Sequence, residues 1–262
     1  MTRRIFHRAT WLGRARSQCH RGLIKEGTED YQRALALGGD RDIIDYELAA
    51  FGAANIPIAM PKSVVTRLFD EHAESFDEHL VQKLSYQTPI KIFNLISSYK
   101  SWKPLDVLDL GCGTGLMGEQ LRPIAKKLCG VDISSNMLTK AERRAIYDEL
   151  ICEDIIKFLS SHSQTYDLVV AADVFVYFGD LTRVFELVPR VFRHQGYFCF
   201  SVEATNESEY VLRTTGRYQH SVEYLRRLAK NYGFVLDVID SSVLRKESEK
   251  DVDGYIAMMH YS

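Results

Sequence analysis

The chain has 262 residues, enough for one sizeable α/β domain with a smaller appendage. Hydrophobic residues make up 46% of it and charged residues 26%, which is ordinary for a globular protein. The formal net charge of −2 gives no reason to expect strong nucleic-acid attraction, and no long apolar run predicts a membrane span or a secretory signal. We therefore expect a cytoplasmic protein, a monomer or weak dimer, with no nucleic-acid partner and no membrane association.

Residues 1–26 differ from the rest in charge, because their arginines and single lysine are not balanced by any acid before Glu26. Such a segment fits a solvated basic tail, a translation-start artefact or an Arg-rich targeting sequence, and of these we favour a flexible tail. The five cysteines show no C-x-x-C spacing and no cluster with histidine. We therefore expect buried thiols in a reducing compartment rather than a disulfide framework or a metal site.

Residues 27–60 predict two short helices and a linker. Apolar residues recur at helical spacing after Thr28, which is placed to cap the first helix, and the pair Gly38-Gly39 ends it. A second helix follows, and two X-Pro pairs then mark the linker. Residues 61–100 predict further helices that carry an apolar and aromatic stripe, with Pro61 in the first turn.

From residue 105 the pattern alternates between strands and helices, which predicts a mostly parallel sheet covered on both faces. Strands are expected at 105–110, 127–131, 149–152, 167–172, 197–202, 234–240 and 254–260. Helices are expected at about 115–123, 134–145, 155–160, 180–194 and 219–232. The last two strands are joined without a convincing helix, so we expect an antiparallel hairpin at one edge of the sheet.

The most informative segment is VLDLGCGTG at residues 107–115, where a buried strand runs into three alternating glycines. Glycine has no Cβ and tolerates positive φ, so this backbone lets a bulky ligand approach closely, and the N–H groups of the next helix face that ligand. The glycines are Gly111, Gly113 and Gly115, with Cys112 between the first two.

Asp109 lies on the strand, two residues before the first glycine. A carboxylate there is expected to accept backbone N–H bonds from the glycine turn. It suits a positively charged cofactor and would be badly placed beside a pyrophosphate. The rival interpretation is a dinucleotide-binding fold, whose fingerprint is G-x-G-x-x-G; here the third glycine comes one residue early.

Two further strands also end in acids. Asp132 ends the second strand, 21 residues after Gly111, where a carboxylate is able to grip both hydroxyls of a ribose. Cys152-Glu153-Asp154 ends the third strand, and we favour Asp154 over Glu153 as the functional acid. Helix capping is the structural alternative for both Asp132 and Asp154.

These motifs together resemble those of class I S-adenosylmethionine (SAM) methyltransferases, over residues 61–262. The resemblance implies a Rossmann-like seven-stranded sheet with its last strand reversed. It implies that Asp154 accepts from the adenine amino group while the next backbone N–H, of Ile155, donates to the ring. Met137 is implied to lie near the adenine, with core packing as the alternative. The remaining cofactor contacts that we predict are Ile133 and Ala172.

The stretch LFDEHAESFDEHL at residues 68–80 resembles a helix that small-molecule methyltransferases place as a lid over SAM. It makes residues 61–100 a predicted helical lid, with Phe76 as a cofactor contact and Phe69 and His79 as further candidates. YQRALAL at residues 31–37 looks like the last helix of a tetratricopeptide repeat. The chain is thus similar to bacterial predicted methyltransferases that carry such a fragment, here within 27–60.

The exit of the fourth strand is expected to border the transferred methyl group, through Asp173 and Tyr177. His220, in the segment GRYQHS, is a third candidate for the acceptor pocket, so these three are the predicted catalytic residues. Enzymes that methylate amines of nucleic-acid bases usually show [DNS]-P-P-[YFW] at this exit; the chain has Ala172-Asp173-Val174-Phe175 instead.

The favoured function is methyl transfer from SAM to an O, N or C centre of a small molecule, mainly through proximity and orientation. One alternative is a protein methyltransferase that uses the N-terminal helices to hold a peptide. A second alternative is a SAM-binding scaffold without catalysis.

Overall fold

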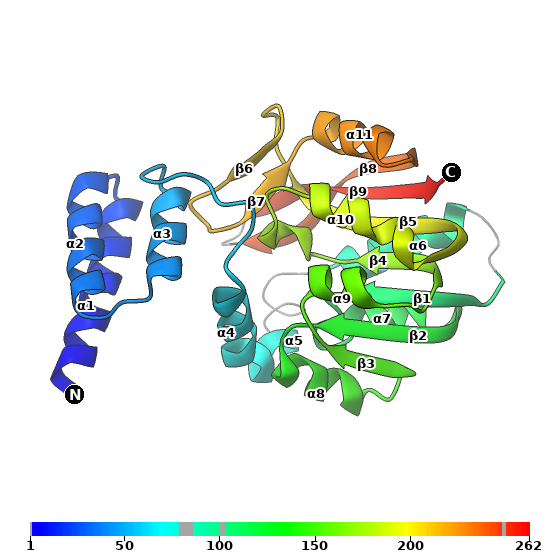
Figure 1. Ribbon diagram of the computed structural model, residues 1–262, viewed down its shortest axis with the longest axis horizontal. Coiled ribbons are helices and arrows are strands. Elements are labelled where there is room, and N and C mark those ends of the chain that lie inside the picture. Colours follow the sequence, from blue (N-terminus) through cyan, green and yellow to red (C-terminus); the bar gives the residue numbers. More distant parts are fainter. Residues whose placement is uncertain (1, 79–85, 100–102, 248–249) are drawn as a thin grey trace.

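A helical unit stands beside an α/β domain, as Figure 1 shows. The computed structural model describes residues 2–78, 86–99, 103–247 and 250–262. Helices α1 (Thr2–His20), α2 (Ile24–Ala36) and α3 (Arg41–Ala50) form the helical unit. It meets the α/β domain at a hairpin, where the Tyr46 hydroxyl donates to the Gly216 carbonyl at 2.8 Å.

We predicted a flexible tail for residues 1–26. This prediction is wrong, because the segment forms α1 and the start of α2. The two helices approach closely at Gly27, where an added Cβ would lie 2.3 Å from the Cys19 sulfur. Arg14 donates to both oxygens of the buried Asp30, at 2.5 and 2.6 Å. Arg14 and Arg16 are therefore paired with acids farther along the chain, Asp30 and Glu47, a relation that local composition does not reveal.

The third helix completes this unit through polar contacts. The Asp40 side chain caps α3 by accepting from the backbone N–H of Asp42 at 3.0 Å. Glu47 of α3 accepts from the hydroxyl of the fully buried Tyr31 at 2.7 Å. Thr28, expected at a helix start, lies inside α2, which begins at Ile24. A relation of these helices to tetratricopeptide repeats stays a prediction.

The predicted lid region contains helices where the structure describes it. These are α4 (Lys62–His72), the 3₁₀ turn η1 (Ala73–Ser75), α5 (Phe76–Glu78) and α6 (Thr88–Tyr99). His79 lies outside the described residues.

The described residues of the α/β domain form one nine-stranded sheet. Its main path runs β3-β2-β1-β4-β5, and β9 pairs antiparallel with both β5 and β8. The strands are β1 (Leu105–Leu110), β2 (Ala125–Asp132), β3 (Glu149–Cys152), β4 (Tyr166–Ala171), β5 (Phe192–Ala204), β6 (Tyr210–Leu212), β7 (Tyr218–His220), β8 (Phe234–Glu247) and β9 (Lys250–Tyr261). The mostly parallel sheet with a reversed last strand is thus confirmed.

Helices cover both faces of this sheet (Figure 1). Those between and after the strands are α7 (Leu116–Leu121), α8 (Ser135–Arg143), α9 (Ile155–Ser161), α10 (Thr182–Leu187) and α11 (Val222–Asn231), with short 3₁₀ turns η3 (Phe175–Tyr177) and η4 (Val188–Val191). Alternate residues of a strand face opposite ways, so Val107 packs with α6 and α7 while Leu108 packs with α9 and α10.

Two features of the sheet depart from the sequence prediction. Strands β6 and β7 form a short hairpin that was not expected. Because β7 occupies the start of the helix predicted at 219–232, the observed helix α11 begins only at Val222. Strands β8 and β9 are also longer than predicted. β8 continues to Glu247 instead of ending at 240, and β9 begins at Lys250 instead of 254. This extension of β8 includes Arg245, which lies at the carboxyl edge of the sheet.

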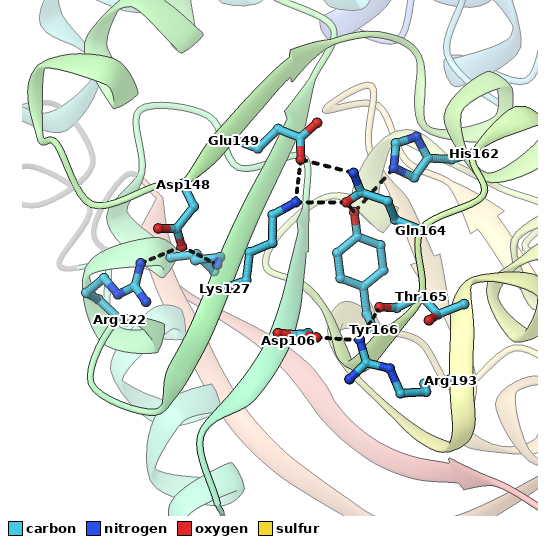
Figure 2. Close-up of polar contacts among 11 residues, drawn as sticks. Asp106, Arg122, Lys127, Asp148, Glu149, His162, Gln164, Thr165, Tyr166 and Arg193 are labelled. Carbon is cyan, nitrogen blue, oxygen red and sulfur yellow. Dashed lines mark hydrogen bonds and ion pairs between the residues drawn. The ribbon is translucent and has the colours of Figure 1, made fainter.

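The opposite edge of the sheet, at the strand starts, carries a network of polar contacts (Figure 2). Lys127 donates to Glu149 at 2.8 Å, and Asp148 accepts from both Arg122 and the Leu128 backbone N–H, at 2.8 and 2.7 Å. These side chains are partly solvent-exposed, so each pair contributes about 0–1 kcal/mol to stability. This edge supports the fold, and it supplies control positions for experiments on the other edge.

Among the described helices, none combines the length and the apolar character needed to cross a bilayer.

Candidate active site

The carboxyl ends of β1, β2, β3 and β4 meet at one edge of the sheet because these strands are parallel neighbours. A cavity of about 470 Å³ opens there, between this edge and α4. Most of the site residues predicted from the sequence line it. They are Gly111, Cys112, Gly113, Asp132, Ile133, Asp154, Ile155, Ala172, Asp173, Tyr177 and Phe76.

The glycine turn has the backbone conformation that its sequence predicts. Gly111, Gly113 and Gly115 all adopt positive φ, at 68°, 54° and 95°. Gly111 faces Val174, whose Cγ2 would lie 2.5 Å from an added Cβ. An added Cβ on Gly113 would meet no atom within 4 Å, so this glycine leaves open space. Gly115 does not line the cavity.

Asp132 orders the glycine turn, a role that the sequence analysis gave to Asp109. One carboxylate oxygen of Asp132 accepts from the Gly113 N–H at 2.9 Å, and the other accepts from the Ser134 N–H at 2.8 Å. Burial raises the pKa of this carboxyl, and the backbone donors oppose that shift. The same side chain that lines the cavity therefore also fixes the loop beside it.

Asp109 lies behind the glycine turn and does not line the cavity. One of its oxygens accepts from the Tyr147 hydroxyl at 2.7 Å, while the other is buried without a hydrogen-bond partner. Burial raises the pKa of Asp109 to about 7. Gly118 makes room for the phenol, because an added Cβ would lie 2.3 Å from the Tyr147 hydroxyl.

Asp154 has the capping role that the sequence offered as its structural alternative, and it also faces the cavity. Its carboxylate caps α9 by accepting from the Lys157 N–H at 3.0 Å, and it also lines the cavity. Lys62, at the start of α4, pairs with it at 2.9 Å. Glu153 pairs instead with Lys157 and does not line the cavity.

Helix α4 lies over the cavity and is connected to the α/β domain by side chains on both. Phe69 packs edge-on against Phe76 and Tyr177, with ring centroids 5.9 and 5.4 Å apart. Ser134 donates to Asp70 at 2.5 Å. The roof of the cavity is therefore aromatic and its rim is polar.

A second connection links the turn below α4 to the glycine loop. The Asp77 carboxylate accepts from the Thr114 hydroxyl and from Arg144, the latter at 2.5 Å. Arg144 also donates to the Thr114 carbonyl at 2.7 Å. The segment that closes the cavity is thus joined to the turn that borders the ligand space.

Asp173 sits at the inner end of the cavity in the left-handed region, at φ 55°. A non-glycine residue in this conformation costs about 1–3 kcal/mol and is typical of functional sites. The Ser201 hydroxyl holds it by donating to its carboxylate at 2.9 Å and accepting from its N–H at 2.8 Å. Burial raises the pKa of Asp173, and the nearby Arg245 opposes that shift.

His220 is not brought to this cavity. Its ring is fully buried, stacks on Tyr224 and places Nε2 2.9 Å from the Gly179 carbonyl oxygen. Burial lowers its pKa to about 4. Its position on β7, inside the domain, gives it a packing role instead of a place at the acceptor. Met137 is likewise fully buried and does not line the cavity.

The structure adds residues that the sequence analysis did not single out. The linker before α4 lies across the cavity, held by a bridge from Ala59 to Phe178 and by the Met60 N–H donating to Tyr177 O at 2.8 Å. Tyr86, Arg217 and Arg245 also line the cavity. Of these additions, only the linker had a signal in the sequence, its X-Pro pairs. They indicated an irregular segment but not its position at the cavity.

Comparisons with known proteins agree with this geometry. Residues 108–200 match the family model described as a methyltransferase domain. The ubiquinone biosynthesis O-methyltransferase of Salmonella paratyphi A is 24% identical over 169 residues, covering 60% of this chain and 65% of that protein. The malonyl-[acyl-carrier protein] O-methyltransferase of Acetivibrio thermocellus is 29% identical over 145 residues, covering 53% and 49%. The chain spans about half the length of the curated relatives it matches.

Solved structures extend the likeness to the whole α/β domain. The magnesium protoporphyrin IX methyltransferase of Synechocystis, crystallised with SAM, superposes with a TM-score of 0.59 at 17% identity, covering 77% of this chain and 97% of that one. Residues 108–200 are thus similar in sequence to a methyltransferase domain, and the α/β domain has the fold of this SAM-bound structure.

Proposed function

We propose that the protein transfers a methyl group from SAM to an O, N or C centre of a small molecule. One observation carries this proposal. The residues predicted to hold SAM, such as Gly113, Asp132 and Asp154, line the same cavity as Asp173 and Tyr177 at its inner end. Donor and acceptor would therefore meet in one enclosed space.

The residues present fit SAM in shape and charge. Space lies open beside Gly113, and a side chain there would fill it. Asp132 and Asp154 bring two carboxylates to the same wall, which suits hydroxyl and amino donors on a positively charged ligand. Asp132 already uses both oxygens for backbone N–H groups, and a carboxylate has further lone pairs for ribose hydroxyls.

Catalysis by this chain would consist chiefly of alignment. Bound SAM supplies a methyl group on a sulfonium, which needs no further activation. Well-oriented proximity lowers a barrier by about 7–11 kcal/mol. The aromatic side chains of Phe69 and Phe76 line the cavity, and Asp173 lines it where it would face the acceptor. Burial raises the pKa of Tyr177, so its hydroxyl stays protonated and acts as a donor.

Calorimetric titration with S-adenosylhomocysteine (SAH), the demethylated product of SAM, tests the cofactor site. Asp132→Asn keeps the size of the side chain but weakens its grip on hydroxyl donors, and we expect about a 10- to 100-fold loss of affinity. Asp148→Asn is the matched control, because Asp148 also accepts from a backbone N–H but lies at the opposite edge of the sheet (Figure 2). A wild-type protein that binds neither SAM nor SAH would refute the proposal.

A further inference from the structure

An arginine is buried at the inner end of the cavity. Arg245, from the extended part of β8, is 2% exposed and lines the cavity. Two glutamates hold it: Nε donates to Glu247 at 2.9 Å, and Nη2 donates to Glu203. These contacts fix the plane and direction of the guanidinium, which arginine's rigid fork makes possible.

The third nitrogen of this fork, Nη1, is buried and has no hydrogen-bond partner. Its nearest charged neighbour is a carboxylate oxygen of Asp173 at 3.5 Å, where Ser201 holds the other oxygen. The ion pair with Asp173 leaves Nη1 without a hydrogen bond, and a buried donor without one costs stability, by an amount that is larger for a charged group. A fixed donor left open inside a ligand cavity points to a ligand atom that accepts.

The surroundings of Nη1 supply further donors. Arg217, which pairs with Glu247 at 2.5 Å, lines the same cavity, as do the phenols of Tyr86 and Tyr177. Burial raises the pKa of both phenols, so both keep their protons. Glu203 and Glu247 lie behind Arg245 and do not line the cavity. The surface offered to an acceptor at this end is therefore rich in donors.

We propose that Arg245 binds a carboxylate group of the methyl acceptor, so that the substrate is an organic acid. This inference rests on the proposed function and adds the class of substrate. Nη1 offers a charged donor to one oxygen of such a carboxylate, and charge-assisted hydrogen bonds are stronger than neutral ones. Arg217 in the same cavity adds a second positive charge. Asp173 repels a second carboxylate less when it is protonated, and burial, which raises its pKa, favours that form.

Binding of simple probes to the SAH-saturated protein tests the inference without knowledge of the natural acceptor. Butyrate, benzoate and glutarate are each compared with the corresponding amide by ligand-observed NMR. We expect at least one acid to bind about tenfold more tightly than its amide, since charge-assisted pairs are about twice as strong as neutral ones. Arg245→Lys should remove most of this preference, because a point charge does not reproduce the fork.

Arg193→Lys is the matched control, since Arg193 also contacts two carboxylates but lies at the opposite edge of the sheet (Figure 2). SAH affinity is measured for every variant and shows whether the domain is folded. The inference is overturned if acids and amides bind the wild type equally, if no acid binds, if butylammonium or benzylammonium binds better, or if Arg245→Lys keeps the preference. Loss of SAH binding by the wild type would instead refute the proposed function itself, so the two failures are distinguishable.

Discussion

Replacing Tyr147 by phenylalanine tests how the buried carboxylate behind the glycine turn is stabilised. Among the described residues, the Tyr147 hydroxyl provides the one hydrogen bond to the Asp109 carboxylate, at 2.7 Å. The second carboxylate oxygen is buried without a hydrogen-bond partner. A hydrogen bond to a charged group is worth about 1.5–3 kcal/mol. Tyr147→Phe should therefore destabilise the ionised form of Asp109 by this amount and raise its pKa by about one to two further units.

The effect should depend on pH. Burial raises the pKa of Asp109 to about 7, against about 3.9 in an unfolded chain, so the folded state binds more protons between these values. The contribution of Asp109 to the free energy of unfolding consequently falls as pH rises, by about 4 kcal/mol in all for three pKa units. At pH 5.5 Asp109 is protonated in both proteins, and the added cost of Tyr147→Phe should stay below about 1 kcal/mol. At pH 9 it should reach about 2–3 kcal/mol.

Urea unfolding of both proteins at pH 5.5, 7 and 9 measures this difference. Tyr166→Phe is the control, because Tyr166 is also a buried tyrosine but its hydroxyl contacts Gln164 and His162, at 3.4 and 3.5 Å (Figure 2), and the Cys129 thiol instead of a carboxylate. Its cost should be nearly the same at pH 7 and pH 9, because no carboxylate depends on this hydroxyl. If Tyr147→Phe showed the same small cost at all three pH values, the reasoning about Asp109 would be refuted.

Two further predictions follow from the glycine turn and from His220. Gly113→Ala should lower the free energy of unfolding of the free protein by only about 1–2 kcal/mol, the cost of its positive φ, since no atom lies near the added Cβ. The same change should weaken SAH binding at least about tenfold in calorimetry. Unchanged affinity would contradict the proposed position of the cofactor. His220→Gln should make unfolding less sensitive to acid. Because burial lowers the pKa of His220 to about 4 from about 6.5, the wild type should lose about 3 kcal/mol as pH falls through that range. Equal losses in both proteins during urea titrations at pH 7 and pH 4.5 would show that another group is responsible.

The sequence determined the sheet and the cofactor edge because both depend on local patterns. The buried strand at residues 105–110 and positive φ at Gly111 and Gly113 follow from neighbours along the chain, and the structure shows both. Parallel strands then bring Asp132 and Asp154 to the same edge without further information. Even so, sequence reasoning gave the backbone N–H groups of the turn to Asp109, because the register that places Asp132 beside Gly113 is a tertiary fact.

Contacts between distant segments were decided only by the tertiary structure. Local composition predicted a flexible basic tail, whereas Arg14 finds its partner Asp30 only once two helices have packed together. We predicted His220 in the acceptor pocket, but it lies on the short, unpredicted strand β7, which buries its side chain in the core. Arg245 gave no signal at all, since its burial and its open nitrogen arise from an extended strand far from the motifs. The cavity wall at the glycine turn was thus predictable from sequence, while the wall around Arg245 depends on pairings between distant segments that a one-dimensional pattern does not contain.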